Sequence, residues 1–361
     1  MDFYRGRRIL VTGGTGSIGS QIVRQLLAAG PRVLRILSRD ETKQMYLQEE
    51  LARGRSVDNV RFLIGDVRDP ARLRRSMEGI EIVFHAAAMK HVPACEYNPF
   101  EAVQTNVLGT QNVISAAREA GVGRVVAVST DKATLPENTM GATKLLAERL
   151  IAAAHISSPG QVLCAVRFGN VLGSRGSLVP LVQQRLEAGQ PIALTHPAMT
   201  RFMMTTEDAV RLVLEAGARA NGGEIFILRM PSLRVKDLIE VLVAEYAARV
   251  ERPIEEFPVH VTGIRAGEKL HEVLLTEDEA RRTRRDGDLF ILEPRGLEPS
   301  GLETRAIDVA PADRGEASKA GGVRSYESNT AELLTKGGIR SLLARAGVLP
   351  ARQSVPEAAL A

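Results

Sequence analysis

The sequence predicts an α/β fold, in which a doubly wound parallel sheet is joined to a smaller C-terminal α/β unit. Short runs rich in Val and Ile alternate with longer segments of helical period over the first half of the chain. Strands that are apolar on both faces are typical of a parallel sheet covered by helices on both sides. A glycine-rich turn also follows the first apolar run directly, over residues 12–19.

The expected strands and helices alternate along the chain. The strands lie, in order, in RILVTGG, VLRILSRD, VRFLIGD, EIVFHAAA, RVVAVST, VLCAVRFGN and GGEIFILR, about seven in all. Segments of helical period include SQIVRQLLAAG, EAVQTNVLGTQNVISAAREAG and GATKLLAERLIAAAH. SLLARAG predicts a last short helix. Segment 294–325, rich in Pro, Gly, Ala and charge, indicates a long loop or arm.

The composition limits the class of protein. The 361 residues suffice for a large core and two structural units, and 47 basic against 43 acidic residues give a net charge of +4. With 4% aromatic residues and no Trp, a nucleic-acid groove is disfavoured. Cys95 and Cys164 fit neither a disulfide framework nor a metal site, which suits a reducing cytosol. We expect no signal peptide, no membrane span and a cytoplasmic protein.

The turn at residues 12–19 predicts a dinucleotide site. Its glycines allow a tight turn and a close backbone approach to a pyrophosphate, which then meets the unpaired N–H groups of the following helix. The position directly after a first strand favours a Rossmann-type cofactor domain over a plain turn. The expected cofactor contacts of the turn are Gly13, Thr15, Gly16, Ser17, Ile18 and Gly19.

The end of the second strand indicates which nicotinamide cofactor to expect. An acidic residue at this place holds the ribose 2′-OH of NAD, but Ser38 and Arg39 stand there instead. Arg39, helped by Lys43, suits a 2′-phosphate, so we favour NADP over NAD. The alternative is that Arg39 is a surface residue and Asp40 supplies the carboxylate one position later.

Later strand ends continue the same crevice. Asp66 and Val67 end the third strand, where an Asp can bind the adenine amino group. Ala86, Ala87 and Ala88 end the fourth strand, and their small side chains let the backbone approach the cofactor. Each motif alone is compatible with a structural turn, but successive C-terminal strand ends trace one binding crevice.

A candidate catalytic strip follows the fifth strand and comprises Ser129, Thr130, Asp131, Lys132, Met140 and Lys144. In the short-chain dehydrogenase/reductase superfamily a Ser or Thr precedes Tyr-x-x-x-Lys, whose i, i+4 spacing puts both side chains on one helix face. Met140 therefore stands in place of the tyrosine, while Lys144 is kept. Alone, Met140 is typical of a core residue. Asp131 and Lys132 are either a reactive pair or a solvated surface pair.

A series of motifs runs in order from residue 11 to about 275: TGGTGSIG, SRDETKQ, GDVRDPARL, VFHAAAMKHVPACEYNPFEAVQTNVLGT, VSTDKATLPENTMGATK, RFGNVLGSRGSLVPL, MTRFMMTTEDAV and GEKLHEVLL. They resemble the nucleotide-sugar dehydratases of polysaccharide biosynthesis, extended short-chain dehydrogenases that act on UDP-N-acetylglucosamine. The later SYESNT fits the same resemblance. With Met140, the chain is similar to the soluble capsule-type 4,6-dehydratase with C5-epimerising activity, and to large membrane-bound 4,6-dehydratases whose membrane domain we do not expect here.

The resemblance implies dehydration by hydride borrowing, with Asp131 as the acid that expels the 6-hydroxyl and Lys132 as the base at C5. Thr130, Lys132 and a water held by Lys144 remain open as acceptors of the 4-hydroxyl proton. A UDP-sugar substrate, C5 inversion and a homo-oligomer, a hexamer, are also implied. Further expected cofactor contacts are Lys90, Ser129, Lys144 and Phe168.

Substrate contacts are expected on both sides of the crevice. The resemblance implies that Thr105 and Asn106 face the sugar and that Arg265 and Glu268 recognise uridine and phosphate, while Arg201 is a natural phosphate partner. The whole expected set is Lys90, His91, Thr105, Asn106, Asn170, Ser177, Arg201, Arg265 and Glu268. The alternatives are a loop histidine at 91, a surface ion pair at 201 and a helix cap at 268.

These expectations divide the chain into three parts. We expect an NADP-binding domain over 1–170, to which about 200–230 return, and a substrate-binding domain from 171–199 and 231–293, with 294–361 as an extended arm and C-terminal helix. Rival functions are a nucleotide-sugar 5,6-dehydratase, an epimerase on the same fold, and a non-catalytic NADP-binding regulator.

Overall fold

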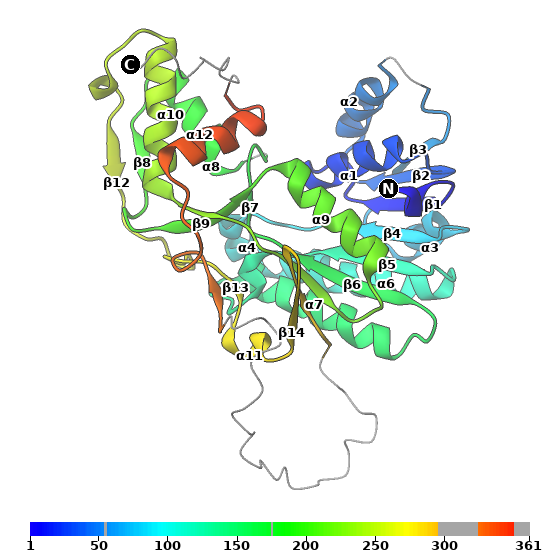
Figure 1. Cartoon of the computed structure of the whole chain (residues 1–361). Coiled ribbons are helices and arrows are strands. Elements are labelled where there is room, and N and C mark those ends of the chain that lie inside the picture. The colour runs from blue at the N-terminus through cyan, green and yellow to red at the C-terminus, as the bar shows by residue number, and fades with distance from the viewer. Residues whose placement is uncertain (54–55, 175, 295–323, 350–361) are drawn as a thin grey trace, which may run out of the picture. The chain divides into compact units, whose positions relative to one another are not determined.

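The computed structural model describes residues 1–53, 56–174, 176–294 and 324–349, and is drawn in Figure 1. The chain divides into two compact units. The first comprises Met1–Phe168, Val210–Arg229 and Val273–Tyr326, and the second comprises Gly169–Ala209, Met230–Glu272 and Glu327–Ala361, each within the described residues. The candidate catalytic strip lies entirely in the first unit.

The first unit is built on a nine-stranded sheet with the order β14-β15-β10-β6-β5-β4-β1-β2-β3. In chain order its strands are β1 (Arg8–Thr12), β2 (Val33–Ser38), β3 (Val60–Ile64), β4 (Ile82–His85), β5 (Arg124–Val128), β6 (Val162–Arg167), β10 (Ile225–Leu228), β14 (Thr283–Asp286) and β15 (Leu289–Leu292). Seven strands run parallel, which confirms the expected class, and the order reverses between β1 and β4. A ligand crevice is expected at that switch point.

Helices cover the sheet of the first unit. They are α1 (Ser17–Ala28), α2 (Glu41–Ala52), α3 (Pro70–Met77), α4 (Val92–Tyr97), α5 (Pro99–Ala102), α6 (Gly109–Glu119), α7 (Thr139–Ile156) and α11 (Glu277–Ala280). A π-helix, η2 (Val103–Leu108), joins α5 to α6, and 3-10 turns are η1 (Asp2–Tyr4) and η3 (Asp131–Ala133). α6 contacts both α3 and α7, so these helices form one layer, while α1 packs on β1 and β2.

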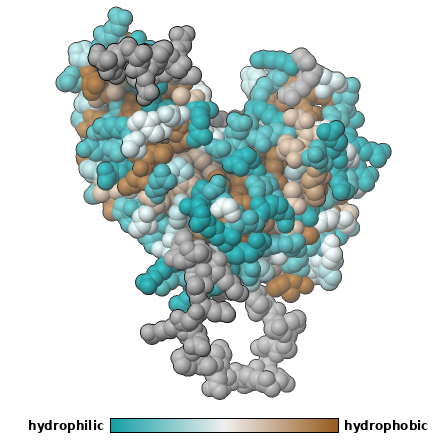
Figure 2. Space-filling model, viewed as in Figure 1, coloured by the Kyte–Doolittle hydropathy of each residue, from teal (hydrophilic) through white to brown (hydrophobic). Residues whose placement is uncertain are grey.

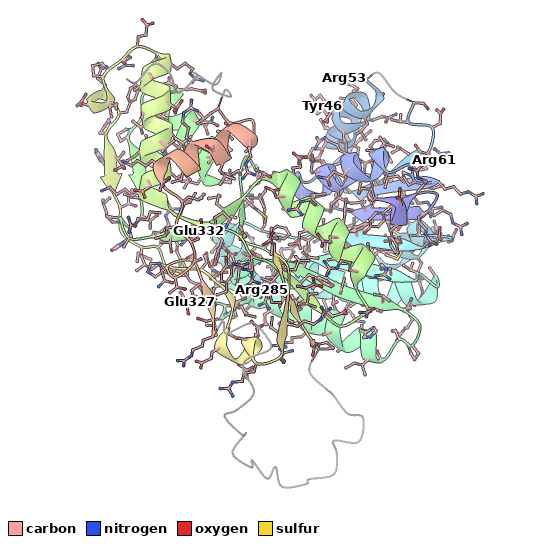
Figure 3. All side chains as sticks on the ribbon, viewed as in Figure 1. Tyr46, Arg53, Arg61, Arg285, Glu327 and Glu332 are labelled. Carbon is pink, nitrogen blue, oxygen red and sulfur yellow. The ribbon has the colours of Figure 1, made fainter. Side chains whose placement is uncertain are left out.

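Arginines lie on both edges of the large sheet. β3 ends it on one side and β14 on the other. Figure 3 labels Arg61 on β3, whose side chain points outward, and Arg285 on β14; both are exposed. Charged edge residues discourage pairing with the sheet of another molecule. Elsewhere hydrophilic residues dominate the face drawn in Figure 2, with hydrophobic residues among them.

The second unit has its own core. A three-stranded sheet of β11 (Ser232–Arg234), β9 (Thr200–Met204) and β7 (Asn170–Val171) accompanies a parallel pair of β8 (Ile192–Leu194) and β12 (Val259–Val261). Its helices are α8 (Leu178–Glu187), α10 (Val235–Arg249), α12 (Lys336–Arg345) and the 3-10 turn η4 (Ile254–Glu256). Leu238 and Leu242 of α10 share one apolar cluster with Ile339 and Leu343 of α12. α9 (Thr206–Arg219) begins in this unit and continues into the first.

The expected domain limits need correction in three places. The returning segment is 210–229, and 273–292 belongs to the first unit rather than to the substrate domain. There β15 pairs antiparallel with β10, and β14 with β15, across a two-residue connection in which Gly287 has a φ of 60°. The connecting pair, Gly287 and Asp288, before a second apolar run was a hairpin signal in the sequence. The expected C-terminal helix exists as α12 but belongs to the second unit's core, and most of segment 294–325 lies outside the described residues.

A short pair of strands involves the last described segment. β13 (Val273–Leu275) pairs with β16 (Tyr326–Glu327). Ser328, which is fully buried, follows β16, and its hydroxyl accepts from the backbone N–H of Glu272 at 2.9 Å. The SYESNT motif of the sequence therefore has a packing role in the fold.

Candidate active site

The glycine-rich turn brings the exits of β1 and β4 into close contact. Gly13 has a φ of +66°, and a Cβ there would lie 2.6 Å from the backbone nitrogen of Ala87. A Cβ on Gly19 would lie 2.2 Å from the Gly13 carbonyl oxygen, so only glycine fits at either position. α1 then begins at Ser17, with Gly16 as its N-cap and no side-chain cap. This cradle fits a pyrophosphate, which would meet the N–H groups of α1.

The residues at the end of β2 are used in different ways. Asp40 is the N-cap of α2, where its carboxylate accepts from the Lys43 backbone N–H at 2.9 Å and pairs with the Lys43 ammonium. Arg39 leaves 58% of its side chain exposed and lies 3.5 Å from Asp66 Oδ2. The hydroxyl of Ser38 is buried. The Asp40 carboxylate thus caps its own helix, whereas the Arg39 guanidinium is largely exposed.

Asp66 follows β3 as a fixed carboxylate. It accepts from the backbone N–H of Arg68 at 2.9 Å and from its guanidinium at 2.8 and 3.0 Å. Burial opposes ionisation, but the hydrogen bonds and charge of Arg68, together with Arg39, hold the pKa of Asp66 below its usual range. A surface hollow of about 550 Å³ opens here, lined by Asp66, Arg68, Asp69, Pro70, Gln104, Leu108 and Asn112. Val67 is buried beside it.

Asp131 and Lys132 form an acid–amine pair at the exit of β5. Asp131 has 0% of its side chain exposed, and Lys132 Nζ lies 3.0 Å from its Oδ1 with 23% of the lysine side chain exposed. The Thr130 hydroxyl donates to the same Oδ1 at 2.9 Å, and the Asp131 N–H donates to the Phe168 carbonyl oxygen at 3.0 Å. The alternative of a solvated surface pair is therefore wrong, because the carboxylate lies in the interior.

Lys144 lies on the buried face of α7. Its Nζ donates to the carbonyl oxygen of Val128, the last residue of β5, at 2.6 Å. Burial lowers the pKa of this amine to about 8, and the nearby carboxylate of Glu148 acts in the opposite direction. Lys144 is thus anchored to the strand end and titrates close to physiological pH.

Met140 packs in an apolar cluster. It is buried with Cys95 and Ala102, and Met89 and Val92 pack against the three. The thioether fills space between α4, α5 and α7, as a core methionine does. The expected catalytic position is therefore occupied by a packing residue, and Thr130, Lys132 and a water held by Lys144 stay the predicted candidates for the proton acceptor.

The amide of Asn106, which the sequence predicts to face the sugar, is engaged within the protein. The side chain is 1% exposed, and its Oδ1 accepts from the Met89 N–H at 2.8 Å. Its Nδ2 donates to the Met89 carbonyl at 3.0 Å and to the Thr143 hydroxyl at 2.9 Å. The hydrogen bonds of the amide thus link the segment after β4 to α7. Thr105, beside it in the π-helix, is also buried.

Lys90 and His91 remain accessible on the segment that Asn106 holds. Both are exposed. His91 is the N-cap of α4, and its carbonyl accepts from the Cys95 N–H at 3.0 Å. Partial burial of the ring and then the charge of Lys90 lower the pKa of the His91 imidazole. The geometry leaves both side chains able to reach a ligand.

The other expected substrate residues belong to the second unit: Asn170, Ser177, Arg201, Arg265 and Glu268. Asn170 begins β7, Ser177 is the N-cap of α8 without a side-chain cap bond, and Arg265 is exposed. Their joint action on one substrate stays a prediction.

Arg201 and Glu268 come together within that unit. Arg201 is 7% exposed and donates to three backbone carbonyls at 2.8, 2.8 and 3.1 Å. Its guanidinium also lies 3.7 Å from Glu268 Oε1 and 3.6 Å from Glu272 Oε1. The alternative of a surface ion pair is wrong, because Arg201 is buried and fastens segment 268–272. A phosphate contact of Arg201 stays a prediction.

Sequence reasoning missed a buried ionic network beneath the strip. The Ser129 hydroxyl donates to Glu148 Oε1 at 2.6 Å, and Arg167 donates to Glu148 at 2.7 and 3.1 Å. Arg167 also donates to Glu279 at 2.9 and 3.0 Å. The available signal was the spacing of Glu148, four residues after Lys144 and hence on the same helix face.

A buried histidine was also missed. His85 Nδ1 lies 2.8 Å from the Thr12 hydroxyl, and Nε2 lies 3.1 Å from the Thr110 hydroxyl. The Thr110 hydroxyl donates to the Asn106 carbonyl at 2.6 Å, which assigns the His85 proton to Nε2 and the acceptor role to Nδ1. Burial and then the charge of Lys144 lower the pKa of His85 to about 3, so the ring is neutral.

A family model described as polysaccharide biosynthesis protein matches residues 9–294. The chain belongs to the polysaccharide biosynthesis protein family. The match covers the glycine turn, the catalytic strip and the β14–β15 hairpin. The resemblance to proteins of polysaccharide biosynthesis, drawn from the motifs, is thereby confirmed.

Named relatives of this family member differ in their stated activities. It is 50% identical over 299 residues, 82% of this chain and 89% of the relative, to an uncharacterized membrane protein of Methanocaldococcus jannaschii. It is 42% identical to an inverting UDP-N-acetylglucosamine 4,6-dehydratase of Campylobacter jejuni, over 81% of this chain and 84% of that one. It is 41% identical to a UDP-glucose 4-epimerase of Rickettsia rickettsii, over 76% and 79%.

Solved structures show the same fold. Pen from Bacillus thuringiensis matches 96% of this chain and 99% of its own, with a TM-score of 0.85 and 41% identity. The dTDP-glucose 4,6-dehydratase DesIV of Streptomyces venezuelae, solved with NAD, matches 73% and 86%, with a TM-score of 0.64 and 28% identity. The relatives and solved structures whose names state an activity are thus nucleotide-sugar dehydratases and an epimerase. In the part of the chain that the structure describes, no helix has both the length and the apolarity needed to cross a bilayer.

Proposed function

We propose that this protein is a cytoplasmic, NADP-dependent 4,6-dehydratase that converts UDP-N-acetylglucosamine to the UDP-2-acetamido-2,6-dideoxy-4-hexulose with inversion at C5. The observation that carries the proposal is the buried Asp131–Lys132 pair, 3.0 Å apart at the end of β5. Elimination of the 6-hydroxyl needs an acid and a base within one site, and this pair supplies both. The Campylobacter jejuni relative, named an inverting dehydratase, supports the substrate class.

The pair works as a unit that shares one proton. When the proton lies on Asp131, the carboxyl can donate to the leaving 6-hydroxyl and the Lys132 amine can accept the proton from C5. The Thr130 hydroxyl, 2.9 Å from Asp131 Oδ1, holds the carboxyl in place. Because Lys132 is partly exposed, the pair can exchange protons with solvent through its amine. Delivery of the proton to the opposite face of C5 then inverts that centre.

The cofactor cradle fits a dinucleotide phosphate. NADP, when bound, supplies transient acceptance of the hydride from C4 and its return to C6. We assign the pyrophosphate to the glycine turn, the 2′-phosphate to Arg39, the adenine amino group to Asp66 and the nicotinamide ribose to Lys144. The commitment of Asp40 to its own helix supports NADP over NAD, because no free carboxylate ends β2 in the described structure.

The substrate residues of the proposal lie in both units. Lys90 and His91 are assigned to the cofactor and the sugar, and Asn170 to the sugar or the diphosphate. Arg201 is assigned to a phosphate, and Arg265 and Glu268 to uridine and phosphate, with Glu268 held near Arg201.

The epimerase relative makes a second candidate. Both a 4-epimerase and a 4,6-dehydratase need a proton acceptor at the 4-hydroxyl, so the methionine in the apolar cluster at position 140 does not separate them. The Asp131–Lys132 pair, which can serve elimination of the 6-hydroxyl, favours the dehydratase. An epimerase product keeps the mass of the substrate, whereas a 5,6-dehydratase yields an exocyclic alkene. A non-catalytic NADP-binding regulator would bind NADP without turnover.

Incubation of the purified protein with UDP-N-acetylglucosamine in deuterated water tests the proposal. The expected product has lost one water and carries deuterium at C5, and its ring couplings by NMR show inversion. An unchanged mass with a new C4 configuration would establish the epimerase instead. Unchanged substrate in the presence of bound NADP would contradict the dehydratase assignment.

A further inference from the structure

Glu148 lies one helical turn beyond Lys144 on α7 and is 3% exposed. Both of its carboxylate oxygens are engaged. Oε1 accepts from the Ser129 hydroxyl at 2.6 Å and from Arg167 Nε at 3.1 Å, and Oε2 accepts from Arg167 Nη2 at 2.7 Å. Ser129 is the first residue after β5, directly before the Thr130–Asp131–Lys132 run. Glu148 thus connects the helix of Lys144 to the strand end that carries the proposed acid and base.

The network beneath the strip is charged and buried. Arg167 is 1% exposed and also donates to the Leu274 carbonyl at 2.9 Å and to Glu279 at 2.9 and 3.0 Å. Glu148 and Glu279 share the guanidinium of Arg167, and the charge of Arg282 also acts on Glu279. A buried carboxylate is costly unless cations compensate it. Besides Arg167, the ammonium of Lys144, one turn earlier on the same helix face, is placed to compensate Glu148.

We propose that Glu148 is a positioning residue, which fixes the Ser129 hydroxyl and supplies the counter-charge that keeps Lys144 protonated. The inference rests on the proposed function, in which Lys144 holds the nicotinamide ribose. It agrees with the opposing influences on Lys144, whose pKa is lowered by burial to about 8 and raised by Glu148.

The other charged groups near Lys144 do not replace this counter-charge. His85 of β4 is neutral, since burial and then Lys144 lower its pKa to about 3. Asp131 and Lys132 of η3 balance each other. The remaining charged residues on helices packed against α7 are exposed: Glu96, Glu101, Arg118 and Glu119.

Glu279 offers a matched control. Glu148→Gln and Glu279→Gln each remove one carboxylate partner of Arg167, but only Glu148 bonds Ser129 and lies a turn from Lys144. NADPH affinity, followed by cofactor fluorescence between about pH 6 and 10, reports the charge of Lys144. We expect the alkaline midpoint of binding to move to lower pH by about one unit in Glu148→Gln, because the loss of a close opposite charge disfavours the ammonium. Glu279→Gln should lower Tm similarly and keep the wild-type midpoint.

Glu148→Asp keeps the charge and should keep the wild-type midpoint even if Tm falls. An equal shift in Glu148→Gln and Glu279→Gln, or a lower Tm in Glu148→Gln with no shift, would overturn the counter-charge role. If Glu148→Gln does not fold, Ser129→Ala tests the other contact. It should lower kcat and leave KM and the binding midpoint unchanged, and an unchanged kcat would overturn the positioning role.

The binding measurement needs no turnover, so the two proposals fail separately. If Glu148→Gln shifts the binding midpoint but the wild-type protein does not dehydrate the sugar nucleotide, only the proposed dehydratase activity is refuted. Dehydration without the shift refutes only the role of Glu148.

Discussion

Lys132 is the residue whose removal should separate chemistry from cofactor binding. Its amine lies 3.0 Å from the buried Asp131 carboxylate and retains 23% exposure. As the proposed base at C5, its loss in Lys132→Ala should lower kcat for dehydration by about 10²–10⁴-fold. NADP affinity, measured by titration calorimetry, should stay within about twofold.

Lys236→Ala is the control for that prediction. Lys236 is a half-exposed lysine of α10 in the second unit, where it pairs with Glu240. Its replacement should leave both kcat and NADP affinity unchanged. A large loss of NADP affinity in Lys132→Ala would show that Lys132 contacts the cofactor rather than C5.

Arg39 should distinguish the two nicotinamide cofactors. Its side chain is 58% exposed at the end of β2, where a 2′-phosphate would be expected. Removal of one charged hydrogen-bond donor in Arg39→Ala should raise the NADP dissociation constant by about tenfold or more and leave that of NAD nearly unchanged. Arg61→Ala, an exposed arginine on the edge strand β3, is the matched control. Equal losses for NADP and NAD in Arg39→Ala would refute the 2′-phosphate role.

The residues predictable from sequence are those whose setting is local. The glycine turn and the Asp131–Lys132 pair follow directly from strand ends, because side chains at those ends meet at one edge of a parallel sheet. The contacts of Asn106 could not be predicted, and for Glu148 the spacing from Lys144 indicates only the helix face on which it lies. Their roles depend on Met89, 17 residues away, and on Arg167, 19 residues away, and no periodicity reports such pairings.

Among the elements, the parallel strands were predictable and the hairpin was assigned to the wrong unit. β14 contains Arg284 and Arg285, so its polar sequence lacks the apolar signature of the other strands. Only its pairing with β15, which is buried throughout, makes it part of the sheet. The π-helix η2 was not predicted either, because its sequence has an ordinary helical period. Asn106, whose amide donates to the Thr143 hydroxyl, lies within this π-helix.

His85 ties three elements together and should make their stability depend on pH. The neutral ring bridges Thr12 of β1 and Thr110 of α6 from β4. Its pKa is lowered from an ordinary 6.5 to about 3 in the folded protein, chiefly by burial. Its contribution to stability is therefore fully present above pH 6.5 and is lost as the pH falls toward 3, by at most about 1.4 kcal/mol per pH unit.

The measurement is urea unfolding at a series of pH values. Wild type should lose stability more steeply between pH 6.5 and 4 than His85→Gln, whose amide keeps one donor and one acceptor but cannot titrate. His260→Gln, which changes an exposed histidine of β12, should keep the wild-type slope. Parallel curves for wild type and His85→Gln would show that the ring does not stay neutral in the fold.

At the scale of the whole molecule, the chain crosses between its two units several times. β6 leads from the first unit into the second, α9 returns to the first, and the segments after β10 and β16 re-enter the second. Composition and periodicity find a second unit but not these crossings, because each is set by contacts between distant segments. The C-terminal helix α12 is the clearest case, since its short apolar face carries no information about the α10 surface that it covers.

Self-association is the prediction that belongs to this scale. Large apolar side chains lie exposed on the α4–η2 stretch, with Tyr97 89% and Phe100 65% exposed. Such exposure suits an interface with another protein surface, here a second copy of the chain. We expect light scattering to give the mass of a homo-oligomer, a hexamer by family resemblance, and Tyr97→Ser with Phe100→Ser to reduce that mass. Tyr46→Ser, an exposed tyrosine of α2 labelled in Figure 3, should not change it. A monomeric mass for the wild-type protein would rule out the oligomer.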